Sequence, residues 1–176
     1  EGIDGWSGIG MMAIANTRVV RRSVALMEQN QKSYGTNFTF GEHGLFSTKR
    51  MARLASYSSI IAFLVLATPL KRLVRPLLPK PGEGPTQETQ DKGWFRATFV
   101  AYAEDNERKI CSMYGSGDPG YKSTAKLVCE SALSLARSNE LPGGSEYGGV
   151  LTPAVGLGDV LIERLRNKEI EFKVLH

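Results

Sequence analysis

The chain has 176 residues, 41% of them hydrophobic and 23% charged, which suits one globular core and excludes a disordered or fibrous protein. The net charge of +4 is uneven, because residues 1–80 carry 11 Lys and Arg against 4 Asp and Glu, whereas residues 81–176 carry 11 against 14. Two cysteines and two histidines without metal-ligand spacing disfavour a disulfide framework, a metal site and a histidine-based triad.

Residues 1–50 are expected to form an amphipathic helix and a loop leading into the domain. Apolar residues recur at helical spacing over residues 11–30, which predicts the helix. The glycine-rich residues 5–10 are expected to be a flexible segment before it, and residues 33–47 a loop with a short extended piece. The chain begins at Glu1 without a secretory signal, so we expect that sequence upstream was removed or left out. The helix contains three arginines: Arg18, Arg21 and Arg22.

Residues 51–80 are expected to associate with a membrane. Residues 54–70 carry no charge and have basic residues on both sides, a pattern typical of a lipid interface. Because the run is short and contains serines and Pro69, we favour an in-plane or re-entrant anchor over a full span or a buried core helix. The expected membrane contacts are Ile60, Ile61, Phe63, Leu64 and Leu66.

Residues 81–176 are expected to form an α/β core after a proline-rich connector at residues 76–85. The fold class is therefore α+β, with a largely antiparallel or mixed sheet, helices packed on it, and the apolar helical segment. The polar residues 104–108 predict a hairpin turn between the first two strands. The predicted strands are residues 94–102, 109–114, 148–151 and 170–175, and the predicted helices are residues 121–137 and 156–168.

Three glycines match the spacing G-x-G-x-x-G between a predicted strand and a predicted helix, where a dinucleotide-binding turn would lie. However, Pro119 lacks a backbone donor, an antiparallel hairpin precedes the turn, and the acidic residue expected after a second parallel strand is absent. We therefore favour a structural turn in which Asp118 accepts amide hydrogens at the helix start. The helix amino terminus could still hold an anionic group of a substrate. The three glycines are Gly115, Gly117 and Gly120.

Eight blocks, in this order, resemble saccharopine dehydrogenase-like oxidoreductases and the related trans-acting enoyl reductases. The resemblance covers nearly the whole chain, and the ordered combination is more specific than any one block. The blocks are residues 16–23, 81–85, 93–95, 117–121, 124–126, 130–133, 149–153 and 161–165.

The resemblance implies the carboxy-terminal substrate and interface domain of a membrane-associated oxidoreductase, not catalytic alone. In that family a Rossmann domain precedes this region and binds NAD(P), so we expect no cofactor in this chain and a Rossmann domain upstream or on another chain. Catalytic residues are not assigned. The location implied is intracellular and membrane-associated, on an organelle or a lipid droplet. The substrate or interface candidates are Arg21, Arg22, Gly117, Asp118, Gly120, Tyr121 and Thr124.

Two structural alternatives remain for these candidates: the arginine pair would form a solvated or interdomain salt-bridging face, and Tyr121 would pack at the helix start. A different function also remains open, that of a non-catalytic structural subunit of a larger membrane complex derived from this family. Nucleic-acid binding is not expected, because the basic residues flank an apolar run and do not alternate with aromatic residues.

Overall fold

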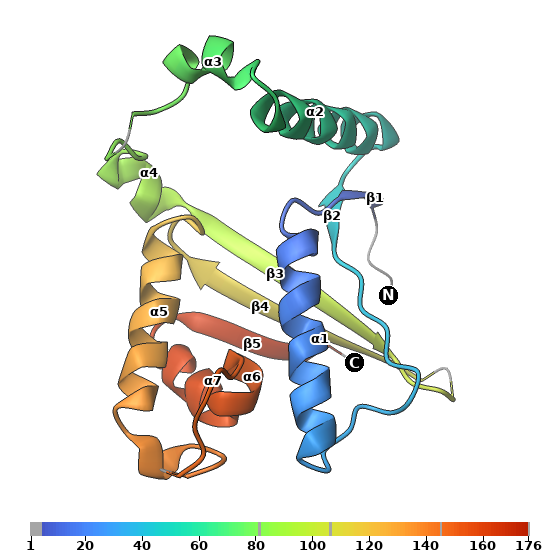
Figure 1. Ribbon diagram of the computed structural model, residues 1–176, viewed down its shortest axis with the longest axis vertical. Helices are drawn as coiled ribbons and strands as arrows, with labels where there is room; N and C mark the ends of the chain where they lie inside the picture. The colour runs from blue at the N-terminus through green and yellow to red at the C-terminus, as the bar shows by residue number, and fades with distance from the viewer. Residues whose placement is uncertain (1–4, 81, 106, 145, 176) are drawn as a thin grey trace. The chain divides into compact units, whose positions relative to one another are not determined.

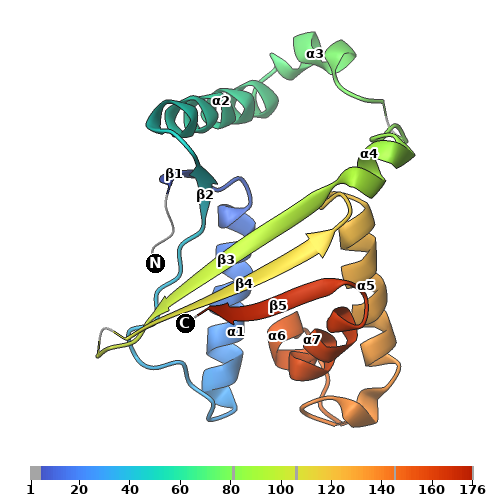
Figure 2. The same ribbon diagram turned by 180° about the vertical axis from the view of Figure 1, so that it is seen from behind.

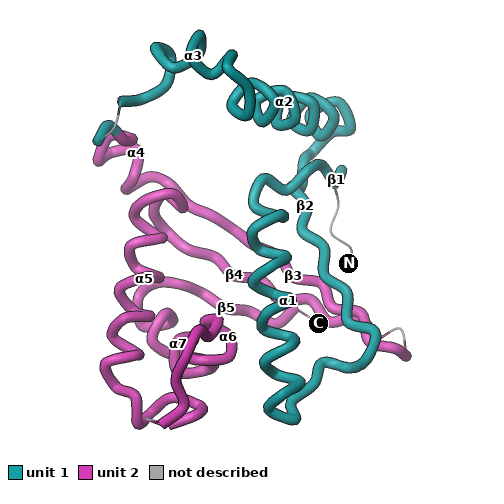
Figure 3. The backbone as a smooth tube through the Cα atoms, in the orientation of Figure 1, with its two compact units in different colours: residues 1–83 teal, residues 84–176 magenta. Residues whose placement is uncertain are grey.

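The computed structural model describes residues 5–80, 82–105, 107–144 and 146–175. The chain forms two compact units, Glu1–Glu83 and Gly84–His176 (Figure 3). Each unit contains one small antiparallel sheet together with helices, so the predicted α+β class is confirmed. Pro81 in the predicted connector and Asn106 in the predicted hairpin turn lie outside the described residues.

The first unit is built on a two-stranded sheet, in which Trp6 lies opposite Phe46 and Ile9 lies opposite His43. The longest helix of this unit, α2, contacts both strands (Figure 1). The elements in chain order are β1 (Trp6–Ile9), α1 (Ala13–Gln29), β2 (His43–Phe46), α2 (Lys49–Ala67), α3 (Lys71–Val74) and the 3-10 helix η1 (Arg75–Leu77).

The prediction of a flexible segment at residues 5–10 is wrong, because Trp6–Ile9 forms β1. Pairing with β2 and packing against α2 order this segment. A Cβ atom at Gly8 would lie 2.8 Å from Cε2 of Phe46 and 3.2 Å from the carbonyl oxygen of Ala52, so glycine allows the helix to touch the strand. The amide of Ile9 also donates to Oγ of Ser56 over 3.1 Å. These partners are distant in sequence, and local propensity could not indicate them.

The helix predicted at residues 11–30 is confirmed as α1, and the extended piece within the predicted loop is β2. Helix α2 begins after Thr48, whose hydroxyl accepts a hydrogen bond from the amide of Met51 over 3.3 Å. It ends at Ala67 because Thr68 precedes Pro69 and takes the extended conformation that a following proline favours.

The second unit is built on a three-stranded antiparallel sheet in the order β3-β4-β5, with β4 in the centre. Figures 1 and 2 show α5, α6 and α7 on one face of this sheet. The elements are α4 (Gln87–Lys92), β3 (Trp94–Tyr102), β4 (Arg108–Ser116), α5 (Lys122–Leu135), the 3-10 helix η2 (Ser138–Glu140), α6 (Pro153–Gly156), α7 (Gly158–Arg166) and β5 (Ile170–Leu175).

The hairpin and the last strand of this unit agree with the prediction, but three details differ. The strand predicted at residues 148–151 is wrong: the segment is irregular, and Gly149 has a φ of 128° that a strand does not accommodate. The helix predicted at residues 156–168 is confirmed as α7, but a separate short helix, α6, precedes it, and Gly158 takes a φ of 51° at their junction. Helix α4 was not predicted, since its polar sequence has no apolar periodicity.

The core of the second unit is small and contains a charged pair. Helix α5 turns polar side chains inward, with Ser123 and Ser134 fully buried. Its Glu130, whose side chain is 7% exposed, pairs with Arg164 of α7 at 2.8 Å between Oε2 and Nη2. This pair lies where α5 and α7 contact each other. The buried apolar residues are Ile110, Val155, Leu157, Leu165 and Ile170.

We predict that Arg164→Met lowers the free energy of unfolding by about 2 kcal/mol, because Glu130 would remain buried without its cation. Chemical denaturation measures this. The matched control is Lys92→Met, which breaks the exposed pair with Glu88 and should change stability by less than about 0.5 kcal/mol. Equal effects of the two substitutions would contradict a structural role for the buried pair.

Candidate functional site

The glycine turn between β4 and α5 is held by the end of α4. The amide of Gly117 donates to the carbonyl oxygen of Gly93 over 2.7 Å, and the amide of Asp118 donates to that of Gln90 over 2.8 Å. Two amides at the centre of the turn are therefore already engaged within the protein.

The side chains of the turn are also engaged locally. Oδ2 of Asp118 accepts a hydrogen bond from the amide of Tyr121 over 2.8 Å, which confirms the expected support of the helix start. The buried hydroxyl of Ser123 reaches the carbonyl oxygens of Ser116 and Gly117, at 3.1 and 2.9 Å. The hydroxyl of Thr124 donates to the carbonyl oxygen of Pro119 over 2.6 Å.

Each of the first two motif glycines has a structural reason. A Cβ atom at Gly115 would lie 2.3 Å from Cε1 of Phe95 and 2.8 Å from Cδ1 of Ile170, so glycine makes room for the two neighbouring strands. Gly117 has a φ of 96°, which side chains rarely adopt. At Gly120 a Cβ atom would meet only the carboxylate of Asp118, at an ordinary 3.4 Å.

This turn does not fit the pyrophosphate of a dinucleotide. A dinucleotide-binding turn follows a strand of a parallel βαβ unit, offers free amides at a helix start, and uses its third glycine for close helix–strand packing. Here the preceding strands are antiparallel, the amides of Gly117 and Asp118 are bonded, and Gly120 is not closely packed. A nicotinamide cofactor would need a different cradle.

Two ion pairs flank the turn. Nζ of Lys122 lies 2.6 Å from Oδ1 of Asp91, and Nζ of Lys126 lies 3.1 Å from Oε2 of Glu169. The hydrogen bond from Lys122 lowers the pKa of Asp91 below its ordinary value of 3.8. The hydrogen bonds from Lys126 and then Ser116 lower the pKa of Glu169 below 4.5.

The remaining sequence candidates are more exposed. The side chain of Tyr121 is half exposed, and its ring lies against Gly84, where a Cβ atom would be 3.2 Å from Cζ. Arg21 and Arg22 are exposed on α1 in the first unit, whereas the turn with its candidates belongs to the second. The structure thus brings together the candidates at residues 117–124 in one turn.

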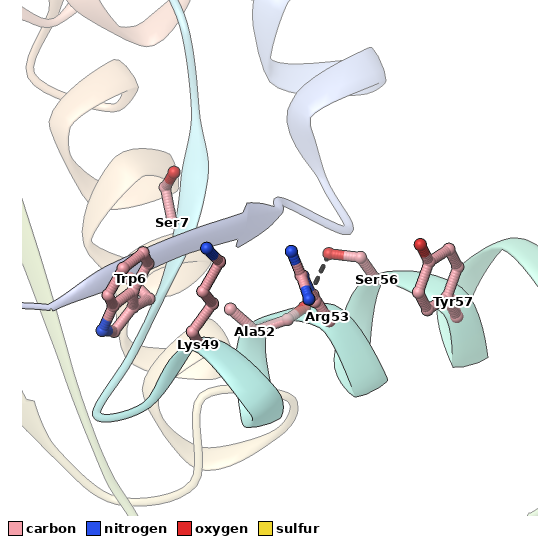
Figure 4. Close-up of a pocket in the computed structure, with 7 residues that line it drawn as sticks. All are labelled: Trp6, Ser7, Lys49, Ala52, Arg53, Ser56 and Tyr57. Carbon is pink, nitrogen blue, oxygen red and sulfur yellow. Dashed lines mark hydrogen bonds between the residues drawn. The ribbon is translucent and has the colours of Figure 1, made fainter.

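Sequence reasoning missed a pocket of about 270 Å³ in the first unit (Figure 4). Three of its side chains, Lys49, Arg53 and Tyr57, follow one another at four-residue spacing on one face of α2. Nζ of Lys49 lies 5.2 Å from the centre of the Trp6 ring, a cation–π contact. The basic flank was visible in the sequence, but only the pairing of β1 brings Trp6 to it. The lining residues are Trp6, Ser7, Lys49, Ala52, Arg53, Ser56 and Tyr57.

The expected membrane contacts all lie on the exposed part of α2. This is the one helix among the described residues long and apolar enough to cross a membrane, and almost none of it is buried. Within the described ranges, no cluster of His, Cys, Asp and Glu could hold a metal ion. His176 lies outside those ranges. The side chains of Ile60, Ile61, Phe63, Leu64 and Leu66 are 45%, 60%, 65%, 56% and 51% exposed.

The chain is similar over most of its length to part of several mycobacterial proteins. A candidate trans-acting enoyl reductase of Mycobacterium tuberculosis is 35% identical over 168 residues, which cover 91% of this chain and 39% of that protein. Trans-acting enoyl reductases of Mycobacterium bovis and Mycobacterium ulcerans are 34% and 33% identical, with the same coverage. No family model matches the chain, and no solved structure matches it significantly.

These similarities support an oxidoreductase-related family. The resemblance to trans-acting enoyl reductases noted in the ordered sequence blocks is confirmed at this coarser level. The chain spans 39% of the length of the curated relatives it matches, so the activity of the whole relatives does not transfer directly.

We predict that Gly117→Ala lowers the free energy of unfolding by about 1–2 kcal/mol, because alanine is strained at a positive φ. The matched control is Gly120→Ala in the same turn, which should change stability by less than about 0.5 kcal/mol. Thermal and chemical unfolding of both variants provide the measurement. If Gly117→Ala is as stable as the parent, the turn does not require its observed conformation.

We predict that Glu169→Gln makes stability less sensitive to acid. Because the pKa of Glu169 is lower in the folded chain than in the unfolded chain, its contribution is complete above about pH 4.5 and is lost as pH falls through the lowered value. The effect is small, since the side chain is 78% exposed. Denaturation midpoints between about pH 6 and pH 3 test this. Lys126→Met should likewise make stability depend less on pH. If stability depends on pH in both variants as it does in the parent, the ion pair is not the cause of the lowered pKa of Glu169.

Proposed function

We propose that this chain is the substrate and interface portion of a membrane-associated, NAD(P)-dependent oxidoreductase related to the trans-acting enoyl reductases, and that it is not catalytic alone. The observation that carries the proposal is the similarity of 91% of this chain to 39% of such reductases. The ordered sequence blocks extend the proposal to the saccharopine dehydrogenase-like group.

The nicotinamide cofactor would be held by a Rossmann domain outside these 176 residues, in the same polypeptide or in another chain. The glycine turn supports this division, because the amides of Gly117 and Asp118 are bonded to the end of α4. The residues of this chain would then shape the substrate side of the site. Asp118 and Thr124 maintain the turn, and Tyr121 is the half-exposed side chain that can reach a substrate.

An interface with a further domain is supported by apolar side chains that α5 leaves exposed. Val128 is 62% exposed, Leu133 50% and Leu135 60%. These side chains lie on α5, the helix that follows directly from the glycine turn. Large exposed apolar side chains gathered on one element favour contact with another protein surface. Exposed Arg21 and Arg22 on α1 are further candidates for such an interface or for an anionic substrate group.

Membrane association is supported by the exposed apolar part of α2 and by the basic residues at its two ends. Membrane association also suits the substrate group in the name of the relatives, enoyl reductase, because an enoyl group is part of an acyl chain. A long acyl chain is apolar, and a reductase at a membrane surface meets it without first extracting it into water. The proposed location is therefore an intracellular membrane or lipid surface.

NADPH titration tests the division between the two parts. The 176-residue chain alone should show no saturable binding, as measured by the fluorescence of the reduced nicotinamide. A chimera that joins this chain to the unmatched part of the Mycobacterium tuberculosis relative should bind NADPH. The matched control is Gly117→Ala within the chimera, which should leave NADPH affinity unchanged once the variant is shown to be folded.

Saturable NADPH binding by the chain alone, weakened by Gly117→Ala, would show that the turn is a dinucleotide site and would overturn the proposed division. A folded chimera that binds no NADPH would count against the oxidoreductase proposal itself. That outcome would favour the alternative of a structural subunit, in which the same fold is kept without a cofactor.

A further inference from the structure

We propose that the pocket between β1 and the first turns of α2 binds the headgroup of an anionic phospholipid. The occupant would hold its phosphate in the pocket while its acyl chains lie against the exposed remainder of α2. This inference rests on the membrane association in the proposed function and adds to it a specific site and a lipid class.

The pocket has the chemistry of a phosphodiester site. Lys49 and Arg53 are one helical turn apart, and both line the cavity (Figure 4). Ammonium and guanidinium groups are the side chains that bind phosphate oxygens best, through charge-assisted hydrogen bonds.

Charge favours an anionic occupant. Residues 43–82, which include the α2 side of the pocket, contain seven Lys and Arg and no Asp or Glu. None of the residues that line the pocket is acidic. Neither Lys49 nor Arg53 forms an ion pair within the part of the chain that the structure describes. A negative surface attracts such a segment more strongly with each basic residue near it.

Aromatic side chains place the pocket at the level of the headgroups. Trp6 is 48% exposed and Tyr57 is 63% exposed, and both line the cavity beside its two cations. Tryptophan and tyrosine are enriched where a membrane meets water, because each combines an apolar ring with a polar group. Tyr57 also lies at the boundary between the pocket and the apolar part of α2.

The packing of α2 limits how far it can enter a bilayer. Ala52 is buried and Ser56 is hydrogen-bonded to β1, so the first turns of the helix remain with the sheet. Residues 57–67 then extend for about 16 Å at the rise of an α-helix, roughly half of the 30 Å hydrocarbon core. The free part of α2 can therefore enter one leaflet and cannot cross both. With the pocket at the headgroups, the helix reaches the acyl chains of the same leaflet.

Vesicle binding tests the site. The 176-residue chain is mixed with vesicles of phosphatidylcholine alone, or of phosphatidylcholine with phosphatidylglycerol, and the bound fraction is measured by sedimentation. The pocket pair Lys49→Gln with Arg53→Gln should lose at least about tenfold more affinity for anionic vesicles than the control pair Lys71→Gln with Arg72→Gln. Both pairs remove two charges, but the control pair lies on α3 outside the pocket. Circular dichroism of each variant checks that it is folded.

A soluble probe separates a lipid headgroup from free phosphate. Trp94→Phe leaves Trp6 as the remaining tryptophan, so its fluorescence reports the pocket. Short-chain phosphatidylglycerol, kept monomeric, should change this fluorescence with saturation, whereas short-chain phosphatidylcholine should not. Inorganic phosphate should bind at least about tenfold more weakly than the lipid, because it has no acyl chains to bury. Equal affinity for inorganic phosphate would overturn the assignment to a phospholipid.

The outcomes distinguish this site from membrane association in general. Equal losses in the pocket pair and the control pair would mean diffuse attraction and would overturn the headgroup site, while membrane association would stand. Polar substitutions at Ile60, Phe63 and Leu64 should weaken binding to both kinds of vesicle, because they remove the apolar contact. A parent chain that binds neither vesicle would overturn the site and membrane association together, and NADPH titration would still test the oxidoreductase part.

Discussion

Two backbone hydrogen bonds join the end of α4 to the turn that connects β4 with α5. They require close approach, since a Cβ atom at Gly93 would lie 2.5 Å from the amide nitrogen of Asp118. With this contact in place, Asp118 caps the backbone before α5, and the buried hydroxyl of Ser123 closes the first turn of the helix. This contact thus lies at the start of α5, the helix that carries Glu130 to its buried pair with Arg164.

The same hydrogen bonds decide what the turn can bind. A glycine motif becomes a phosphate site only when its amides point at the ligand without a protein partner. In this chain the amides of Gly117 and Asp118 have carbonyl partners within the protein. This chain is similar to part of the trans-acting enoyl reductases. Its glycine motif has the spacing of a cofactor-binding turn but forms a structural turn.

In the first unit the corresponding constraint is the contact between α2 and the two-stranded sheet. Gly8 allows the contact, and the bond from Ile9 to Ser56 fixes it. This contact divides the helix into a docked part, which carries Lys49 and Arg53 beside Trp6, and an exposed apolar part. Cationic and apolar surfaces follow each other along one helix, as expected of a segment that meets both headgroups and acyl chains.

The sequence by itself determined the α+β class, helix α1, the hairpin of β3 and β4, the last strand and the apolar character of α2, because each depends on local periodicity and local breakers. Its ordered blocks also indicated the relationship to enoyl reductases. Only the tertiary structure decided that Trp6–Ile9 is a strand, that residues 148–151 are not, and that the motif amides are bonded to α4. The pocket beside Trp6 likewise depends on partners about 40 residues away along the chain, and no local pattern encodes such a pairing.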